Sequence, residues 1–451
     1  MKKQIKNVDI LDLQEKDRWR RTDVTFEDGK ILSLKKNFPC DEVYDGKGLT
    51  LSPGFIDVHM HEENRNDIDV QDYDIAECML KMGVTTAMGG NCGSEKTEIS
   101  QFFQGIDQYG SPINYCLAAG YNSIRKRIGI ADTQKPKAVE MEKIHKELKR
   151  IIDEGAFGIT FGIEYNPNIS TEEILEALKP FYGRTDIFAA AHFRYDGNRG
   201  VESIEEMAYI ARMSQIPFEI SHLSSCCAFG NMKQGLQAIE DSLNEGVDIL
   251  VDAYPYDAFS TQIGTSVFEG DFLSRWDVPL SNIVLTEAPY EGVPLTEEIL
   301  KDARENYPTM LAIAHVMKLD EVKHSLTKPY VMVASDGLYS HHKGHPRGAG
   351  TFPRVLGDFV REGTLTLSQA IYKCTTLPAK RLGLEKEIGT IAPGYRADMV
   401  LFDPKTIQDQ ATFEDGQKPP VGIHQVWVNG ELAIEDNQVV NNRLGKSIRR
   451  K

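Results

Sequence analysis

The sequence predicts an α/β protein that consists of a (β/α)8 barrel of the TIM type and a small β-sandwich domain formed by both chain termini. From Gly54 onward, short apolar runs alternate with long amphipathic segments, which is typical of parallel βα units. Both ends of the chain show a strand-and-turn pattern instead. The 451 residues are enough for one large barrel with an accessory module.

The two chain ends are predicted to form one domain. Near the N-terminus, TFEDGKILSL and VYDGKGLTLS alternate polar and apolar residues around turns, as short antiparallel strands do. Near the C-terminus, EIGTIAPGYRADMVLFDP and GIHQVWVNGELAIEDNQVV return to this pattern. We therefore assign residues 1–53 and 396–451 to the β-sandwich and residues 54–395 to the barrel. The final KSIRRK is expected to be a solvated basic tail.

Eight apolar runs within the central region are candidate barrel strands. They are FIDVHMH, VTTAMGG, NYCLAAG, FGITFGI, IFAAAHF, FEISHL, DILVDAY and VMVASD. A closed barrel of eight such units places its active site at the carboxyl ends of the strands. Two further runs, NIVLTEA and MLAIAHV, indicate an insertion at about residues 259–328, between the seventh and eighth strands. After the eighth strand, LTLSQAIYKCTTLPAKRLGL is predicted to form one helix.

Composition narrows the possible partners. The chain has 51 Lys and Arg against 67 Asp and Glu, and this net charge of −16 argues against nucleic acid and anionic membranes. No stretch reaches membrane-spanning length, and the N-terminus does not resemble a secretory signal. Seven scattered cysteines are typical of a reducing compartment. We expect a cytoplasmic protein with a small-molecule substrate, and we leave a homo-oligomer open.

Metal-capable side chains fall at the ends of the predicted strands. His59 and His61 end the first strand, and residues two apart in a strand point to the same side, so both imidazoles can face one metal ion. Taken singly, such histidines are more often core residues, and an Asp-Gly is more often a turn. Together they indicate a metal site. The others are Cys92 after the second strand, His192 on the fifth, His222 on the sixth and Asp336 on the eighth.

This order of residues resembles the amidohydrolase superfamily of metal-dependent hydrolases. The segments GVTTAMGGNCG, GAFGITFGIEYNPN, EISHL, DAYPYDA and HPRGAGTFPRVLG are similar to the D-aminoacylases, the N-acyl-D-amino-acid deacylases. In that family a cysteine after the second strand replaces the bridging carboxylated lysine that many superfamily members carry after the fourth. This chain agrees, since Cys92 is present and GAFGITFGIEYNP contains no lysine.

The resemblance implies a zinc centre. Cys92, His192 and His222 would hold one tightly bound zinc, which fits the preference of zinc for thiolate and imidazole and leaves a position for water. His59 and His61 would form a second, weaker site, with Cys92 as a bridge. Asp336 would exchange protons with the water and the departing amine, because zinc lowers the pKa of a bound water to about 7. A role for Asp336 as a metal ligand stays open.

The resemblance also implies substrate-binding residues. Arg347 matches the family arginine that clamps the α-carboxylate of the substrate, although a surface-loop arginine is an alternative. Tyr254 and Tyr256 follow the seventh strand, where a phenol can bind a carboxylate or an oxyanion; Tyr256 could instead only pack. His341, His342 and His345 form a local cluster, either a solvated loop or a lid.

One position departs from the family. Members usually carry a lysine after the sixth strand that helps to hold the substrate carboxylate, and here Ser224 occupies that place. Arg347 would then act alone, Lys233 could replace the lysine, or the substrate differs.

The sequence thus predicts a zinc-dependent enzyme that hydrolyses an N-acyl-D-amino acid to a carboxylate and a free D-amino acid. One alternative is another amide, either a dipeptide with a D-residue or a cyclic amide. A more remote one is an inactive binding or assembly barrel, which would have lost part of the ligand set. The ligand set of this chain is complete.

Overall fold

A computed structural model describes residues 1–12, 18–36, 38–63, 73 and 75–451. All eight strands that the sequence predicts for the central region are present, and each is parallel to its neighbours. They are β6 (Phe55–Asp57), β7 (Val84–Gly89), β8 (Asn114–Leu117), β10 (Gly158–Gly162), β11 (Phe188–His192), β12 (Phe218–Ile220), β13 (Ile249–Ala253) and β17 (Val331–Val333).

The parallel strands lie in two sheets that meet at both ends. One sheet has the order β6-β7-β8, and the other β17-β13-β12-β11-β10-β9, where β9 (Ala119–Gly120) directly continues β8. At the other end, the residues after β17 bond to those after β6: the Asp336 amide donates to the His59 carbonyl at 2.7 Å, and the His61 amide donates to the Gly337 carbonyl at 3.0 Å. The segments that follow the first and last strands are therefore neighbours.

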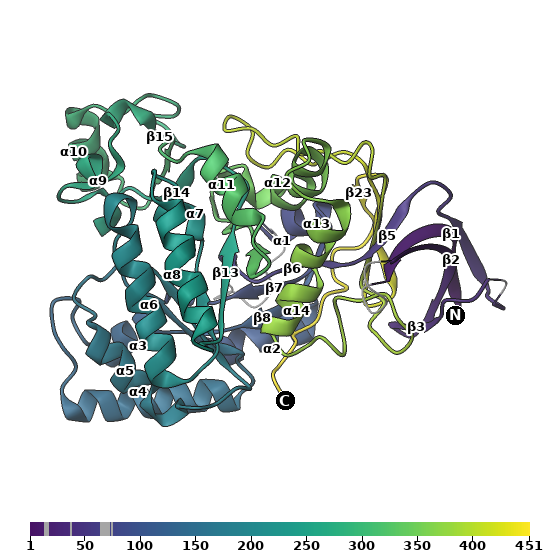
Figure 1. Ribbon diagram of the computed structural model, residues 1–451, viewed down its shortest axis with the longest axis horizontal. Coiled ribbons are helices and arrows are strands. Elements are labelled where there is room, and N and C mark those ends of the chain that lie inside the picture. Colours follow the sequence, from purple (N-terminus) through teal and green to yellow (C-terminus); the bar gives the residue numbers. More distant parts are fainter. Residues whose placement is uncertain (13–17, 37, 64–72, 74) are drawn as a thin grey trace.

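Helices follow these strands and cover them (Figure 1). The longest, α4, buries Met141, Ile144 and Leu148, residues spaced three or four apart, as an amphipathic helix does. The helices of this region are α1 (Ala76–Lys81), α2 (Ile99–Tyr109), α3 (Tyr121–Ile128), α4 (Ala138–Asp153), α5 (Thr171–Leu178), α6 (Gly200–Ser214), α7 (Leu223–Cys227), α8 (Met232–Asn244), α11 (Leu319–Leu326), α12 (Arg347–Arg354), α13 (Leu367–Cys374) and α14 (Thr376–Arg381).

The single helix predicted for LTLSQAIYKCTTLPAKRLGL is wrong, because the structure has two helices, α13 and α14, with a break at Thr375. Pro378 explains the break. A proline has no amide hydrogen, and its ring clashes with the carbonyl four residues earlier, which here belongs to Cys374. The first helix therefore ends at that residue and a second begins beyond it.

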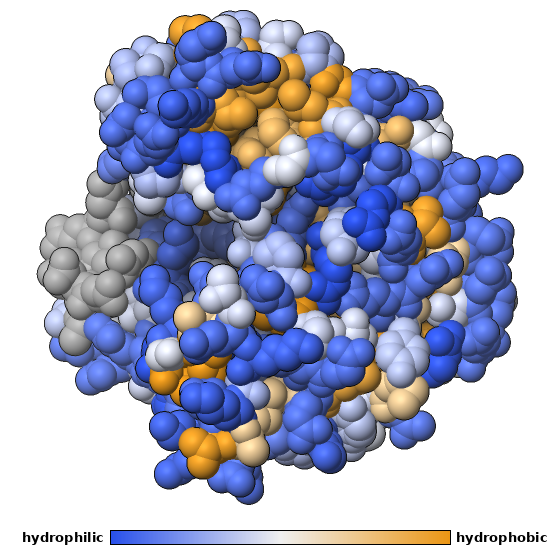
Figure 2. All heavy atoms as spheres, turned by 90° about the vertical axis from the view of Figure 1, so that its left-hand side faces the viewer, coloured by the Kyte–Doolittle hydropathy of each residue, from blue (hydrophilic) through white to orange (hydrophobic). Residues whose placement is uncertain are grey.

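Between β13 and β17 the chain forms a separate antiparallel sheet. Its order is β14-β16-β15, with β14 (Phe259–Gln262), β15 (Ile283–Leu285) and β16 (Leu311–Ala314). The two apolar runs seen in the sequence are β15 and β16. This segment also contains α9 (Phe272–Trp276) and α10 (Glu297–Asn306), at the upper left of Figure 1. The face of the molecule on that side is mostly hydrophilic and is hollowed near its centre (Figure 2).

Strands from both chain ends share one nine-stranded sheet, at the right in Figure 1. The ring centre of Trp427 on β21 lies 6.1 Å from that of Phe26 on β2 and 5.6 Å from that of Tyr44 on β4. In the sheet order, however, β2 is several strands away from β21. The sheet therefore curves around Trp427. Its strands are β1 (Lys3–Asp12), β2 (Arg18–Glu27), β3 (Lys30–Ser33), β4 (Glu42–Asp45), β5 (Thr50–Pro53), β20 (Met399–Phe402), β21 (Ile423–Val428), β22 (Glu431–Glu435) and β23 (Gln438–Val439).

The C-terminal segment is not the solvated tail that its basic residues suggest. The Ile448 amide donates to the Tyr115 carbonyl at 2.8 Å, and the Ile448 side chain is buried. Arg450 pairs with Asp186 at 2.7 Å. One apolar residue among the charges is enough to anchor the segment beside β8, because its backbone can bond to that strand. None of the helices in the described ranges has the length and apolar character needed to cross a bilayer.

Candidate metal centre

The metal-capable residues of the sequence lie where the parallel strands end. Asp336, His59 and His61 lie on the adjoining segments after β17 and β6, His192 is the last residue of β11, and Cys92 and His222 follow β7 and β12. Cys92, His222 and Asp336 have φ angles of 52°, 34° and 49°. A side chain in this left-handed region costs about 1–3 kcal/mol, and such outliers cluster at functional sites. With these backbone angles, the side chains of all three residues lie in the same cluster of candidate ligands.

Three groups of side chains bring their ligand atoms within 4.8 Å of one another: His59 with His61 and Cys92, Cys92 with His192 and His222, and His59 with His222 and Asp336. The Cys92 sulfur lies 3.3 Å from His59 Nε2 and 3.6 Å from His222 Nε2. Cys92 belongs to two of the groups. The structure therefore brings all six predicted ligands together, with the thiol at the centre.

Each of three histidines has one ring nitrogen held by an orienting partner. His59 Nδ1 lies 3.1 Å from Asp252 Oδ2, and His222 Nδ1 lies 2.9 Å from Ser225 Oγ. His192 Nε2 lies 2.9 Å from Glu164 Oε2. The opposite ring nitrogen of each histidine remains for the cluster. For His59 and His192 the partner is a carboxylate, which is the arrangement that orients metal ligands in proteins.

The charges of the cluster match a metal centre. Burial alone would raise the pKa of Cys92, but the neighbouring imidazoles of His59 and His222 hold this pKa well below its usual range. Burial alone would lower the pKa of His192, but Cys92 and Glu164 raise it to about 9. The thiolate is the form of cysteine that binds metals.

The donor set fits a thiophilic divalent ion such as zinc. A thiolate and imidazoles are the ligands that zinc prefers. The Nδ1 atom of His192, whose side chain is buried, has no hydrogen-bond partner among the residues that the structure describes. A buried ring nitrogen without a partner loses free energy unless something binds it. A metal ion beside Cys92 would supply that partner.

Asp336 faces both the histidines and a buried arginine. Its Oδ1 lies 3.2 Å from His61 Nε2 and 3.5 Å from His59 Nε2, and its Oδ2 lies 2.8 Å from Arg347 Nη1. Burial alone would raise the pKa of Asp336, but Arg347 and these histidines hold it well below its usual range. Asp336 is therefore an ionised carboxylate next to the cluster.

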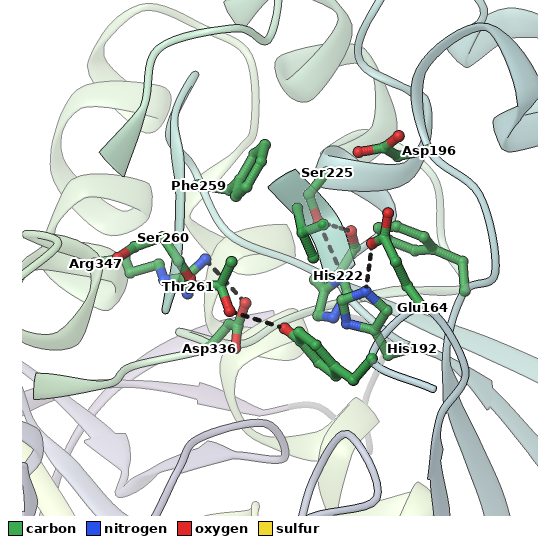
Figure 3. A pocket seen from close by; sticks show the side chains of 13 residues that line it. Glu164, His192, Asp196, His222, Ser225, Phe259, Ser260, Thr261, Asp336 and Arg347 are labelled. Carbon is green, nitrogen blue, oxygen red and sulfur yellow. Dashed lines mark hydrogen bonds and ion pairs between the residues drawn. The ribbon is translucent and has the colours of Figure 1, made fainter. Parts of the chain in front are cut away.

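The cluster borders a small pocket, with a cavity volume of about 20 Å³ (Figure 3). Asp336 and Arg347 are on one side of it, and His192, His222 and Glu164 are on the other. Apolar and hydroxyl side chains complete its wall. The lining residues are Glu164, Tyr165, His192, Phe193, Asp196, His222, Ser225, Phe259, Ser260, Thr261, Val267, Asp336 and Arg347.

The structure does not bring three expected substrate-binding residues to the pocket wall. The Tyr256 hydroxyl donates to Asp409 at 2.7 Å, and the Ser224 hydroxyl donates to the Tyr254 carbonyl at 3.4 Å. Tyr254 is buried under Arg347, whose guanidinium carbon lies 4.6 Å from the ring centre. Ser224 is not among the residues that line the pocket, whereas its neighbour Ser225 is.

Arg347 itself lines the pocket and is only 2% exposed, so it is not a surface-loop arginine. Its Nη2 donates to the Ser260 carbonyl at 3.0 Å, while its Nε makes no hydrogen bond within the described part of the chain. In the histidine cluster after β17, His345 is buried and accepts from the Arg347 amide at 3.0 Å, whereas His341 is exposed. The predicted cluster is therefore divided between a buried residue next to Arg347 and an exposed residue on the surface.

Sequence reasoning missed the carboxylates that orient the ligands. Asp252 is the penultimate residue of β13, and its carboxylate accepts a hydrogen bond from the His222 amide at 2.8 Å in addition to its contact with His59. Glu164 lies two residues after the end of β10. Both are acidic residues at a predicted strand end, which is the signal that could have identified them.

Replacing Asp252 with Asn should weaken metal binding about 10- to 100-fold, because the amide is a poorer partner for His59 Nδ1 than the carboxylate is. Competition with a chromophoric zinc chelator measures this affinity. Asp241→Asn, the same change at an exposed position of α8, is the matched control. An unchanged affinity in Asp252→Asn would show that this carboxylate does not support the centre.

Comparison with known proteins gives the family. Residues 281–433 match the Amidohydrolase family. A D-aminoacylase of Alcaligenes xylosoxydans xylosoxydans is 30% identical over 447 residues, which cover 90% of this chain and 88% of that protein. The N-acyl-D-aspartate deacylase of the same organism is 29% identical over 468 residues, 95% of this chain and 91% of that protein.

Solved structures agree over the whole chain. An N-acyl-D-glutamate deacylase from Bordetella bronchiseptica, complexed with zinc and a phosphonate inhibitor that mimics the tetrahedral intermediate, has a TM-score of 0.88 and 27% identity over 99% of both chains. A D-aminoacylase described by its binuclear metal centre has a TM-score of 0.88 and 28% identity, also over 99% of both chains.

The mixed α/β fold and the cluster at its strand ends define a metal-dependent hydrolase of the amidohydrolase type. Within that class the chain belongs to the D-aminoacylase family, which confirms the resemblance seen in the sequence motifs.

Proposed function

We propose that this protein hydrolyses the amide bond of an N-acyl-D-amino acid, releasing a carboxylate and a free D-amino acid. The observation that carries the proposal is that the Cys92–His192–His222 group borders the same pocket as the ionised Asp336 and the buried Arg347. The names of the relatives, D-aminoacylase and N-acyl-D-aspartate and N-acyl-D-glutamate deacylase, support this chemistry.

Zinc is the ion we propose, with Cys92, His192 and His222 as the ligands of the tight site and His59 and His61 as those of a second, weaker one. Bound zinc supplies a Lewis acid that polarises the amide carbonyl and makes water acidic. Glu164 and Asp252 hold the rings of His192 and His59 in the orientation that this binding needs.

Asp336 is the proposed general base and general acid. Its low pKa makes it ionised at neutral pH, so it can accept a proton from water and then deliver that proton to the departing amine. The contact between its Oδ2 and Arg347 fixes the carboxylate in place, while Oδ1 remains on the side of the histidines. The position of Asp336 Oδ1 next to the proposed zinc ligands therefore fits a proton-transfer role.

Arg347 is the proposed clamp for the α-carboxylate of the D-amino acid. Its Nε, which makes no hydrogen bond to the described residues, offers a donor beyond those that contact Asp336 and Ser260, and a planar guanidinium suits a carboxylate. With Ser224 turned away, no side chain from that position takes the place of the family lysine.

The fold supports two further parts of the proposal. The contacts between the segments after β6 and β17 indicate a closed (β/α)8 barrel over residues 54–395. The curved sheet around Trp427 indicates that residues 1–53 and 396–451 form the β-sandwich. The seven free cysteines suit a cytoplasmic location.

The test is release of free amine from paired N-acetyl-D- and N-acetyl-L-amino acids by the zinc-loaded protein. We expect kcat/KM for the D-enantiomer to exceed that for the L-enantiomer by about 100-fold or more, because a substrate fixed at its carboxylate and its carbonyl presents the wrong face when inverted. Cleavage of neither enantiomer by protein that holds zinc would contradict the proposal.

A further inference from the structure

Arg347 is the first residue of α12, and its amide is held by the side chain of His345. The first four amides of a helix have no partner within the helix, so other groups must accept from them. His345 Nδ1 accepts from the Arg347 amide at 3.0 Å, and the His345 carbonyl accepts from the Gly348 amide at 3.3 Å. His345 therefore fixes the backbone from which the Arg347 side chain extends.

The opposite ring nitrogen of His345 bonds to a different segment of the pocket wall. His345 Nε2 lies 3.0 Å from the Ala258 carbonyl oxygen, and Ala258 directly precedes β14. Two residues further on, the Ser260 carbonyl accepts from Arg347 Nη2 at 3.0 Å, and Figure 3 shows these two residues next to each other. The backbone and the guanidinium of Arg347 are therefore both connected to the start of β14, the backbone through His345.

The two contacts define the state of the imidazole. A carbonyl oxygen only accepts, so Nε2 carries the hydrogen, and Nδ1 must be without one in order to accept from the Arg347 amide. Burial and the charge of Arg347 hold the pKa of His345 well below its usual range. We therefore assign His345 as a neutral imidazole with one donor and one acceptor, each of which has a partner.

Aromatic side chains from two other segments hold the ring of His345. Its centre lies 5.1 Å from the ring centre of Tyr256 and 5.1 Å from that of Phe413, and both contacts are edge-to-face. Tyr256 donates to Asp409, which lies with Phe413 in the segment between β20 and β21. A fully buried ring with both nitrogens bonded and two aromatic neighbours has little freedom to move.

We propose that His345 is a positioning residue for Arg347: it sets the place of the guanidinium in the pocket and, through it, the affinity for the carboxylate of the substrate. The inference rests on the proposed function, since it takes Arg347 to be the carboxylate clamp. A guanidinium binds a carboxylate through directional hydrogen bonds, and displacement by about 1 Å can cost about 100-fold in rate. His345 is not among the described residues that line the pocket, so it acts through Arg347.

The test compares three substitutions of His345 in the zinc-loaded protein, with N-acetyl-D-leucine as the substrate. His345→Asn keeps an acceptor near the position of Nδ1, His345→Gln keeps a donor near the position of Nε2, and His345→Leu keeps neither. We expect KM to rise about tenfold or more in the Gln and Leu variants and about threefold or less in the Asn variant, because only asparagine can still hold the Arg347 amide.

The division between KM and kcat separates positioning of the clamp from damage to the catalytic groups. A group that binds the substrate and the transition state equally changes KM and leaves kcat almost unaffected. The Asp336 amide donates to the His59 carbonyl, so the backbone of the proton-transfer residue is held without His345. We expect kcat to fall by about threefold or less in every variant.

His315→Leu is the matched control. His315 packs on the same Phe413 ring, with ring centres 4.5 Å apart, but it follows β16 and is not among the described residues that line the pocket. This substitution should leave KM as in the wild type. Thermal unfolding must show that each variant is folded; if His345→Leu is not, the comparison of His345→Asn with His345→Gln decides the test.

The outcomes separate the two proposals. An equal rise in KM for His345→Asn and His345→Gln, or the same rise in the control, would overturn the inference and leave the proposed function intact. A KM close to that of the wild type in folded His345→Leu would do the same. Cleavage by no form of the protein, the wild type included, would overturn both.

Discussion

Asp336→Asn should lower kcat by about 10²–10⁴-fold, the usual contribution of a positioned proton-transfer group. Asparagine keeps the size of the side chain but can neither accept nor deliver the proton. Amine release from an N-acetyl-D-amino acid at saturating substrate measures the effect. The loss should appear in kcat more than in KM, because the substrate-binding groups of the pocket remain.

Two controls belong to this measurement. Arg347 Nη1 lies 2.8 Å from Asp336, so the substitution leaves a buried guanidinium without its carboxylate, and thermal unfolding must show that the variant is folded. Zinc content must match that of the wild type, since Asp336 also lies in a ligand group with His59 and His222. Retention of more than about a tenth of kcat by such a protein would exclude Asp336 as the general base.

Cys92→Ala should abolish stable zinc binding and, with it, hydrolysis. The thiol belongs to two of the three ligand groups, so its loss weakens both candidate metal positions at once. Removal of an orienting partner typically costs 10–100-fold in affinity, and removal of a ligand itself should cost at least about 100-fold. Zinc content after dialysis against a weak chelator measures this loss.

Cys116→Ala is the matched control. Cys116 is also fully buried at a neighbouring strand, β8, but it lies in an apolar cluster, where burial raises the pKa of its thiol to about 12. The control should lose some stability and keep its zinc. Equal zinc retention by both variants would argue that the histidines alone hold the metal.

Much of the fold follows from local patterns. The eight parallel strands are where short apolar runs precede polar residues, because a buried strand needs apolar side chains on both faces. The two predictions that were wrong, the single helix and the solvated C-terminal tail, also have physical explanations. The break at Thr375 follows from Pro378, a signal that was available, whereas anchoring of Ile448 beside β8 depends on a strand edge more than 300 residues earlier.

For the candidate site, too, some features follow from the sequence and others only from the tertiary structure. By itself the sequence predicted the six candidate ligands and their meeting point, since each metal-capable residue ends or follows a strand, and the carboxyl ends of parallel strands meet on one side of the fold. Only the tertiary structure decided which neighbour holds each ligand: Asp252 beside His59, Glu164 beside His192 and Ser225 beside His222.

The charge balance of the pocket was likewise decided by tertiary contacts. Arg275 comes from the segment between β13 and β17, yet it reaches Glu164 and Asp196, which follow two earlier strands. Strand periodicity fixes which way a side chain points within a few residues, but it contains no information on which distant segment packs against it. That choice depends on how the loops fold over the strand ends.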